Sequence, residues 1–320
     1  MCSIAATLLD NDYRLDTILK RLYAAFVLLG LFGGSNFIYT KWAAVLVSPG
    51  QISLLRVFFG FVPLTILAWR NGVIRRDQVR YLHHFSVMAA LATAFTYFAM
   101  AKGTSLLPSG IAGVLGGSSP LFTVLASGLF LRHEKMNRMM VCSVVVGLTG
   151  MVLIARPWEG MSAGDAISLA GVAWILAGAM VFGLSYIYVR RYLSPINIAP
   201  LAIVTWQTGL AFLMLLLFTD VSGISQILLD WRAAAGLAIG LGLLGTGASF
   251  VLYYFLLQEL GAVAASGWIY MTPIVALLIG WAAGERVGLL EILAVIVIFG
   301  SIAMLEVGRQ QVARKEAVPL

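Results

Sequence analysis

Residues 109–131 read SGIAGVLGGSSPLFTVLASGLFL and carry no charged side chain. About 20 consecutive apolar residues are enough to cross the hydrocarbon core of a bilayer as an α-helix. The apolar residues are continuous rather than alternating, which argues against the strands of an outer-membrane barrel. The stretch therefore predicts a membrane-spanning helix.

The whole chain has the composition of a protein that crosses the membrane many times. Of its 320 residues, 61% are hydrophobic and 11% are charged, whereas a soluble domain carries about 25% charged residues. This excludes a soluble enzyme, a disordered chain and a secreted disulfide scaffold, and Cys2 and Cys142 alone make no disulfide framework. Residues 1–21 are charged and contain no apolar run, so no cleavable signal peptide is expected.

Apolar runs bounded by charged or turn residues predict ten spans. They cover residues 22–46, 51–69, 83–101, 109–131, 139–155, 166–189, 198–218, 233–257, 262–284 and 287–305. With the N-terminus in the cytoplasm, 15 of the 21 Lys and Arg fall on cytoplasmic segments and 4 on outside loops, while Lys41 and Arg56 lie within spans. Such an excess marks cytoplasmic loops, and it explains the net charge of +7 without nucleic-acid binding. Both termini are therefore expected in the cytoplasm.

The two halves of the chain repeat each other weakly. Residues 109–120, SGIAGVLGGSSP, match residues 262–273, AVAASGWIYMTP, and apolar segments then end in Glu134 and Glu285. Because each half has five spans, an odd number, the second half has the inverted orientation in the membrane. Such inverted repeats are an architecture of secondary transporters. The predicted fold is all-α, with two inverted five-helix repeats (5+5). Its parts are a cytoplasmic tail at 1–21, a first repeat at 22–155, a connecting loop at 156–165, a second repeat at 166–307 and a cytoplasmic tail at 308–320.

Four segments carry a family resemblance. They are GGSNFIYTKWA at 33–43, SLLRVFFGFVPL at 53–64, SSPLFTVLASGLFLRHE at 118–134 and MTPIVALLIGWAAGE at 271–285. Their order and spacing resemble the drug/metabolite transporter superfamily and, within it, the EamA-type exporters. Arg132-His133 departs from the small residue that usually precedes the Glu in this family, which affects only the shape of that corner. The resemblance implies a central cavity surrounded by spans one, three, four, six, eight and nine.

Polar and aromatic side chains on those spans are the candidate substrate-binding residues. An amide such as that of Asn36 needs hydrogen-bond partners where water is absent. Trp268 and Tyr270 lie within a span rather than at its end, where Trp and Tyr usually anchor a protein at the interface. The candidates are Asn36, Tyr39, Lys41, Tyr97, Ser118, Ser119, Trp174, Tyr186, Tyr253, Trp268, Tyr270 and Thr272.

Two basic residues lie within spans, and each has two interpretations. Their long side chains could reach the outer interface and place the charge in water. Alternatively they face the cavity, because a charge inside the membrane is by default a functional hypothesis. For Arg56 the structural interpretation is favoured, since the resembled family carries a similar Arg whatever its members transport. For Lys41 both remain open, and a cavity-facing ammonium would attract a substrate carboxylate.

Corresponding prolines and a glycine pair are the candidate hinge or gate residues. Pro120 and Pro273 occupy matching positions in the two repeats, and each removes a backbone hydrogen bond and is expected to bend its helix. Gly33 and Gly34 add a flexible or closely packed point in span one. Matching bends would let one half rock against the other around a fixed site, which is alternating access.

No catalytic residue, metal site or cofactor is expected. The three histidines lie beside arginines at cytoplasmic edges without zinc-site spacing. GLGLLG at 240–245 fits a dinucleotide fingerprint, but that motif requires a preceding strand, and here it lies inside an apolar span.

The favoured function is secondary export of small metabolites, amino acids or related amphipathic compounds, across the cell inner (plasma) membrane. A carrier of nucleotide sugars or other anionic metabolites is the alternative, although it would need several cations in its cavity. A membrane-embedded lipid-processing enzyme would need a metal cluster or an activated nucleophile within a span, and none is found. The expected partners are a small-molecule substrate and the lipid bilayer, with no nucleic acid, and the protein is a monomer or a homodimer.

Overall fold

The computed structural model describes residues 2–130, 137–156, 167–196, 198–285 and 288–317, and every regular element in this part of the chain is a helix. The elements are α1 (Cys2–Ala43), α2 (Pro49–Arg70), η1 (Arg76–Tyr81), α3 (Leu82–Met88), η2 (Ala89–Phe95), α4 (Thr96–Leu106), α5 (Ser109–Gly116), α6 (Ser119–Phe130), α7 (Arg138–Ala155), α8 (Leu169–Tyr188), η3 (Val189–Leu193), α9 (Pro200–Phe218), η4 (Ile224–Leu229), α10 (Trp231–Ala235), η5 (Gly236–Ala248), α11 (Ser249–Ala265), η6 (Ser266–Tyr270), α12 (Met271–Ala282) and α13 (Leu289–Ala317). Consecutive elements join into nine helical segments that are long and apolar enough to cross a membrane, and Gly267–Ala282 is a shorter apolar segment.

Polar residues mark where several of these helices begin. The Ser48 hydroxyl accepts the Gln51 N–H at 3.3 Å, the Gln51 side chain accepts the Ser48 N–H, and Pro49 occupies the first helical position of α2. The Asn137 side chain accepts the Met140 N–H at 2.9 Å at the start of α7. Short capped turns therefore separate the apolar runs, as membrane helices require.

Several segment boundaries differ from the expected ones, and the third span runs from Arg76 to Leu106 rather than over 83–101. Residues 2–21, expected as a tail, continue α1 without a break. The helix that contains η5 and α11 extends to Ala265, so the ninth segment begins later than residue 262 and is shorter than expected. α13 continues past residue 305 to Ala317. Glu134 and all but the first residue of the 156–165 loop lie outside the described residues.

Both candidate hinge prolines lie just after a helix break. Span four is divided into α5 and α6, and Pro120 is the second residue of α6. Pro273 is the third residue of α12, which follows the 3₁₀ turn η6. A proline in the first turn removes no intrahelical hydrogen bond, because the N–H groups there have no partner within the helix. The expected loss of a bond inside a continuous helix is therefore wrong, and the bends come from the breaks.

Helix α1 packs against elements from the other half of the chain. A Cβ on Gly34 would lie 2.5 Å from the Val275 Cβ and 2.8 Å from the Ala276 backbone nitrogen. A Cβ on Gly33 would lie 2.6 Å from the Thr272 hydroxyl. These glycines let the backbones of α1 and α12 approach closely, as small residues do between membrane helices. They are packing points in a helix that is uninterrupted here.

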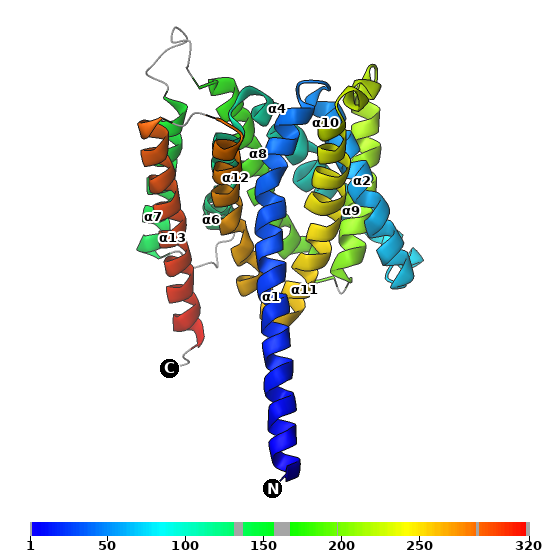
Figure 1. Cartoon of the computed structure of the whole chain (residues 1–320), viewed down its shortest axis with the longest axis vertical. Helices are drawn as coiled ribbons and strands as arrows, with labels where there is room; N and C mark the ends of the chain where they lie inside the picture. Colours follow the sequence, from blue (N-terminus) through cyan, green and yellow to red (C-terminus); the bar gives the residue numbers. More distant parts are fainter. Residues whose placement is uncertain (1, 131–136, 157–166, 197, 286–287, 318–320) are drawn as a thin grey trace.

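Figure 1 shows how the termini and the outermost helices are arranged. α1 extends below the bundle, and both chain termini lie at this lower end. α7 and α13 lie side by side at one edge of the bundle, where Arg156 and Glu291 form an ion pair of 2.7 Å. The Asn137 amide donates to the Gly308 carbonyl at 2.9 Å. The last helices of the two halves thus pack as a pair.

Two π-helical segments contain matching hydrogen bonds. In span three the Thr96 hydroxyl donates to the Leu91 carbonyl at 2.8 Å, and in span eight the Ser249 hydroxyl donates to the Leu244 carbonyl at 2.8 Å. Ser249 precedes Pro273 by as many residues as Thr96 precedes Pro120. Both bonds join a residue to the carbonyl five positions earlier, in or next to η2 and η5. The same local distortion occurs at the same position of both halves.

Candidate functional site

One candidate tyrosine, Tyr186, interacts electrostatically with two others that lie on different helices. Tyr186 on α8 lies within electrostatic range of Tyr97 on α4 and Tyr253 on α11, and also of Arg309 on α13. Tyr186 nevertheless keeps 40% of its surface accessible. Its ring also packs edge-on against Phe182, one turn earlier on α8. We call Tyr97, Tyr186 and Tyr253 the tyrosine cluster.

Arg56 on α2 reaches this cluster. Its Cζ lies 4.0 Å from the centre of the Tyr97 ring, and its Nε donates to the Thr246 hydroxyl at 3.3 Å. Thr246 packs against Gly60, one turn deeper along α2 than Arg56. The side chain therefore points into the bundle, and the expectation that it reaches the outer interface is wrong. Among the described residues, no carboxylate forms an ion pair with Arg56.

A guanidinium in this position has unused binding capacity. It carries five N–H donors in a planar fork and no acceptor, and in the described part of the chain it contacts one hydroxyl and one aromatic ring. Arg56 is half-buried, so part of it remains accessible. A planar carboxylate is the group that best satisfies such a fork, through two parallel hydrogen bonds.

Three other candidates present buried polar atoms without a partner. In the described part of the chain, the Asn36 Oδ1, the Trp268 Nε1 and the Thr272 Oγ1 make no hydrogen bond. Thr272 and Trp268 both lie against Gly33, one turn from Asn36 on α1. Buried polar atoms are normally paired with protein or water. This trio therefore has hydrogen-bonding capacity that the described residues leave unused.

Lys41 is engaged with backbone rather than with this interior. Its ammonium donates to the carbonyl oxygens of Leu107 at 2.7 Å, Ser105 at 3.3 Å and Thr104 at 3.5 Å. These carbonyls are at the C-terminal end of α4, where a cation is favourable to the helix dipole. The structure supports a capping role for Lys41, which neither of the two sequence interpretations included.

Glu285 makes the complementary contact at the start of the next helix, α5. Its carboxylate accepts the backbone N–H groups of Ser109 at 2.6 Å and Gly110 at 2.9 Å, at the N-terminus of α5. Lys41 and Glu285 also attract each other electrostatically. Together they hold both sides of the turn between α4 and α5, at the end of the bundle away from the termini. We call this arrangement the double cap.

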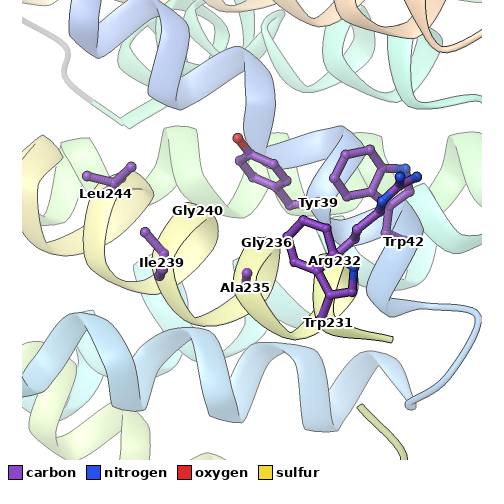
Figure 2. A pocket seen from close by; sticks show the side chains of 9 residues that line it. All are labelled: Tyr39, Trp42, Trp231, Arg232, Ala235, Gly236, Ile239, Gly240 and Leu244. Carbon is purple, nitrogen blue, oxygen red and sulfur yellow. The ribbon is translucent and has the colours of Figure 1, made fainter. Parts of the chain in front are cut away.

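The remaining candidates lie elsewhere. Tyr39 lines a groove on the outside of the bundle (Figure 2). Tyr270 donates to Glu306 at 2.9 Å and accepts from Arg309 at 3.4 Å, linking η6 to α13. Trp174 packs edge-on against Phe98.

Ser118 and Ser119 are buried at the break in span four. The Ser118 hydroxyl donates to the Leu115 carbonyl at 2.5 Å. Both serines therefore belong to the break rather than to the tyrosine cluster. Among the described residues, no group of three or more His, Cys, Asp or Glu could hold a metal ion.

Each half of the chain matches the same family of known proteins. Residues 21–156 and residues 169–307 each match the EamA-like transporter family. The protein named as uncharacterized transporter YoaV from Bacillus subtilis is 26% identical over 261 residues, covering 80% of this chain and 87% of that one. A probable terminal-alkyne amino-acid exporter from Streptantibioticus cattleyicolor is 27% identical over 231 residues, covering 72% of this chain and 74% of that one.

A solved structure shares the fold. A protein of known crystal structure, 18% identical in sequence, superposes with a TM-score of 0.54 over 89% of this chain and 95% of that chain. At this identity the likeness concerns the arrangement of helices and not the ligand.

Proposed function

Because this chain belongs to the EamA-like transporter family, we propose that it exports small amphipathic metabolites of the amino-acid class by alternating access. The family consists of membrane transporters rather than enzymes, so the chain is a multi-pass transporter of the inner (plasma) membrane. The substrate class is the part that rests on the interior of this protein. One relative is named as an amino-acid exporter, which supports the same class.

The observation that carries the substrate proposal is Arg56 beside the tyrosine cluster. Its guanidinium would pair with the substrate carboxylate, and Tyr97, which it already contacts, would hold it in place. The rings of Tyr186 and Tyr253 suit an apolar side chain or an ammonium group. Among the described residues, Arg56 is the basic residue that contacts a ring of the tyrosine cluster. One carboxylate satisfies Arg56, whereas the second charge of a nucleotide sugar would have to compete for Arg309, which already donates to the Tyr270 hydroxyl.

A transport assay tests this proposal. The purified protein is reconstituted in liposomes, and uptake of labelled amino acids is compared with that of their amides and of a nucleotide sugar. Saturable transport of amino acids, with much slower transport of the amides, is the expected result. Preference for the nucleotide sugar would overturn the proposed substrate class.

The proposed topology is ten spans in two inverted halves with both termini in the cytoplasm. The two family matches, the matching hydrogen bonds of Thr96 and Ser249 and the termini at one end of the bundle support it. In a background without Cys2 and Cys142, a cysteine at Ser222 is expected to react with a membrane-impermeant maleimide added outside. A cysteine at Asn71 is expected to react only after the membrane is permeabilised. The reverse pattern would reject the orientation.

The double cap indicates which end of the transport path is closed. Lys41 and Glu285 hold the α4–α5 turn at the outer end of the proposed topology. The tyrosine cluster, by contrast, extends toward Arg309 and the end that carries the termini. We infer a state closed to the outside, from which the halves rock about the breaks before Pro120 and Pro273.

Lys41→Ala is expected to lower the uptake of an amino acid and of its amide by the same factor, about fivefold, because the variant loses a helix cap and no substrate contact. Initial uptake rates of the two compounds in proteoliposomes measure this. Lys102→Ala, a lysine farther from the turn, is the matched control and is expected to transport normally. A loss confined to the carboxylate-bearing compound would return Lys41 to the substrate site.

A further inference from the structure

A groove on the outside of the bundle lies between α1 and the helix formed by α10 and η5. Its volume is about 400 Å³, which is within the range of small-molecule sites. Its floor contains Gly236 and Gly240, where added Cβ atoms would lie 3.0 Å and 2.4 Å from atoms of the Tyr39 ring. Because these two positions carry no side chain, the Tyr39 ring packs directly against the backbone of this helix. Figure 2 shows the residues that line the groove along the helix formed by α10 and η5.

The two ends of the groove differ in chemistry. Trp42, Trp231 and Arg232 gather at one end, and Ile239 and Leu244 lie toward the other (Figure 2). Trp231 is 74% exposed and Trp42 is 40% exposed, as expected for aromatic residues at the level of lipid headgroups. The lining is thus polar at the membrane surface and apolar toward the membrane centre.

The cation at the surface end has no described acidic partner. The Arg232 guanidinium lies 5.8 Å from the centre of the Trp231 ring, and no ion pair joins it to the described residues. The neighbouring Asp230 carboxylate instead accepts the backbone N–H of Arg232 at 2.8 Å, where it caps α10. The guanidinium is therefore available to an anion from the membrane.

The length of the groove matches one leaflet. Arg232 and Leu244 are separated by about three turns of helix, which corresponds to roughly 15–18 Å. Half of the hydrocarbon core of a bilayer is about 15 Å thick. An occupant with an anionic head and a long apolar chain fits this spacing, whereas a small soluble metabolite would leave the apolar end empty.

We propose that this groove binds one anionic phospholipid from the leaflet opposite the chain termini. The phosphate pairs with Arg232 between Trp42 and Trp231, and one acyl chain lies along Ile239 and Leu244. The site is separate from the tyrosine cluster, so the proposal does not depend on the transported substrate.

Lipid binding to the purified full-length protein tests the proposal by native mass spectrometry. Phosphatidylglycerol and phosphatidylethanolamine with identical acyl chains are titrated into the detergent-solubilised protein. Phosphatidylglycerol is expected to bind more tightly, and Arg232→Gln is expected to weaken its binding about tenfold, with little effect on phosphatidylethanolamine. Ile239→Trp, which fills the apolar end, is expected to weaken both lipids.

Lys102→Gln removes a charge at the same end of the bundle, outside the groove, and is the matched control. It is expected to leave both affinities unchanged. Equal binding of the two lipids with no effect of Arg232→Gln would overturn the proposal. The proposal would also be overturned if the protein formed a dimer that no longer bound lipid and that Ile239→Trp disrupted. In that case a second copy of the chain would occupy the groove.

Discussion

Arg56→Gln is expected to lower the rate of amino-acid uptake by about a hundredfold while the protein remains folded. The guanidinium is the proposed partner of the substrate carboxylate, and two charge-assisted hydrogen bonds account for a loss of about 2.7 kcal/mol in transition-state or substrate binding. Glutamine keeps a hydrogen-bond donor for Thr246 but loses the charge and the contact with Tyr97. Initial uptake rates in proteoliposomes and a thermal melting curve together measure the effect.

The controls separate charge from geometry. Arg70→Gln removes an exposed arginine from the end of the same helix and is expected to transport normally. Arg56→Lys keeps the charge but lacks the planar fork that stacks on Tyr97, so an intermediate rate is expected. If Arg56→Gln slows the amino acid and its amide equally, the guanidinium stabilises the helix packing and does not bind the carboxylate.

Glu285→Gln is expected to slow transport by about thirtyfold with little change in substrate affinity. The carboxylate accepts two backbone N–H groups at the start of α5 and lies near the ammonium of Lys41. A neutral amide offers one acceptor oxygen and no charge for the helix dipole, so the closed outer end becomes less stable by about 2 kcal/mol. The equilibrium then shifts toward states that are open to the outside.

Rates and binding must be measured separately for this variant. Uptake reports turnover, and substrate-induced change in the melting temperature reports affinity. Glu259→Gln, which alters an exposed glutamate of α11, is the matched control. Glu285→Asp is expected to be intermediate, because it keeps the charge at a greater distance. Wild-type turnover in Glu285→Gln would show that the double cap does not hold the outer end closed.

Most of the helices were predictable because the membrane imposes one rule on every span. A backbone in hydrocarbon must satisfy its own hydrogen bonds, so each apolar run becomes a helix, and most expected spans match the described helices. The ninth span was misplaced at its start, since the residues around 262 are as apolar as a helix interior and still belong to α11. Hydropathy carries no information on where a helix changes direction.

The interior was less predictable, for a physical reason. Depth along a helix locates a Cα atom, whereas the Arg56 side chain is long enough to point either outward or inward. Its direction depends on Thr246 and Tyr97, which lie far away in sequence. The partners of Lys41 are backbone carbonyls, which no residue pattern reveals. Glu306 was missed because the tenth span was expected to end one residue earlier, although it is the partner of Tyr270.

The partners of α1 set an order for biogenesis. This helix is synthesised first, yet its glycines at positions 33 and 34 pack against Thr272, Val275 and Ala276, which are synthesised near the end. At about 5–20 residues per second, on the order of 10–50 s pass between the emergence of these two contact faces from the ribosome. During that interval the glycine surface of α1 lacks its final partner. A nascent chain that stops before α12 therefore contains an inserted first helix that has not yet found its final neighbour, and late truncations affect the earliest helix as much as the last.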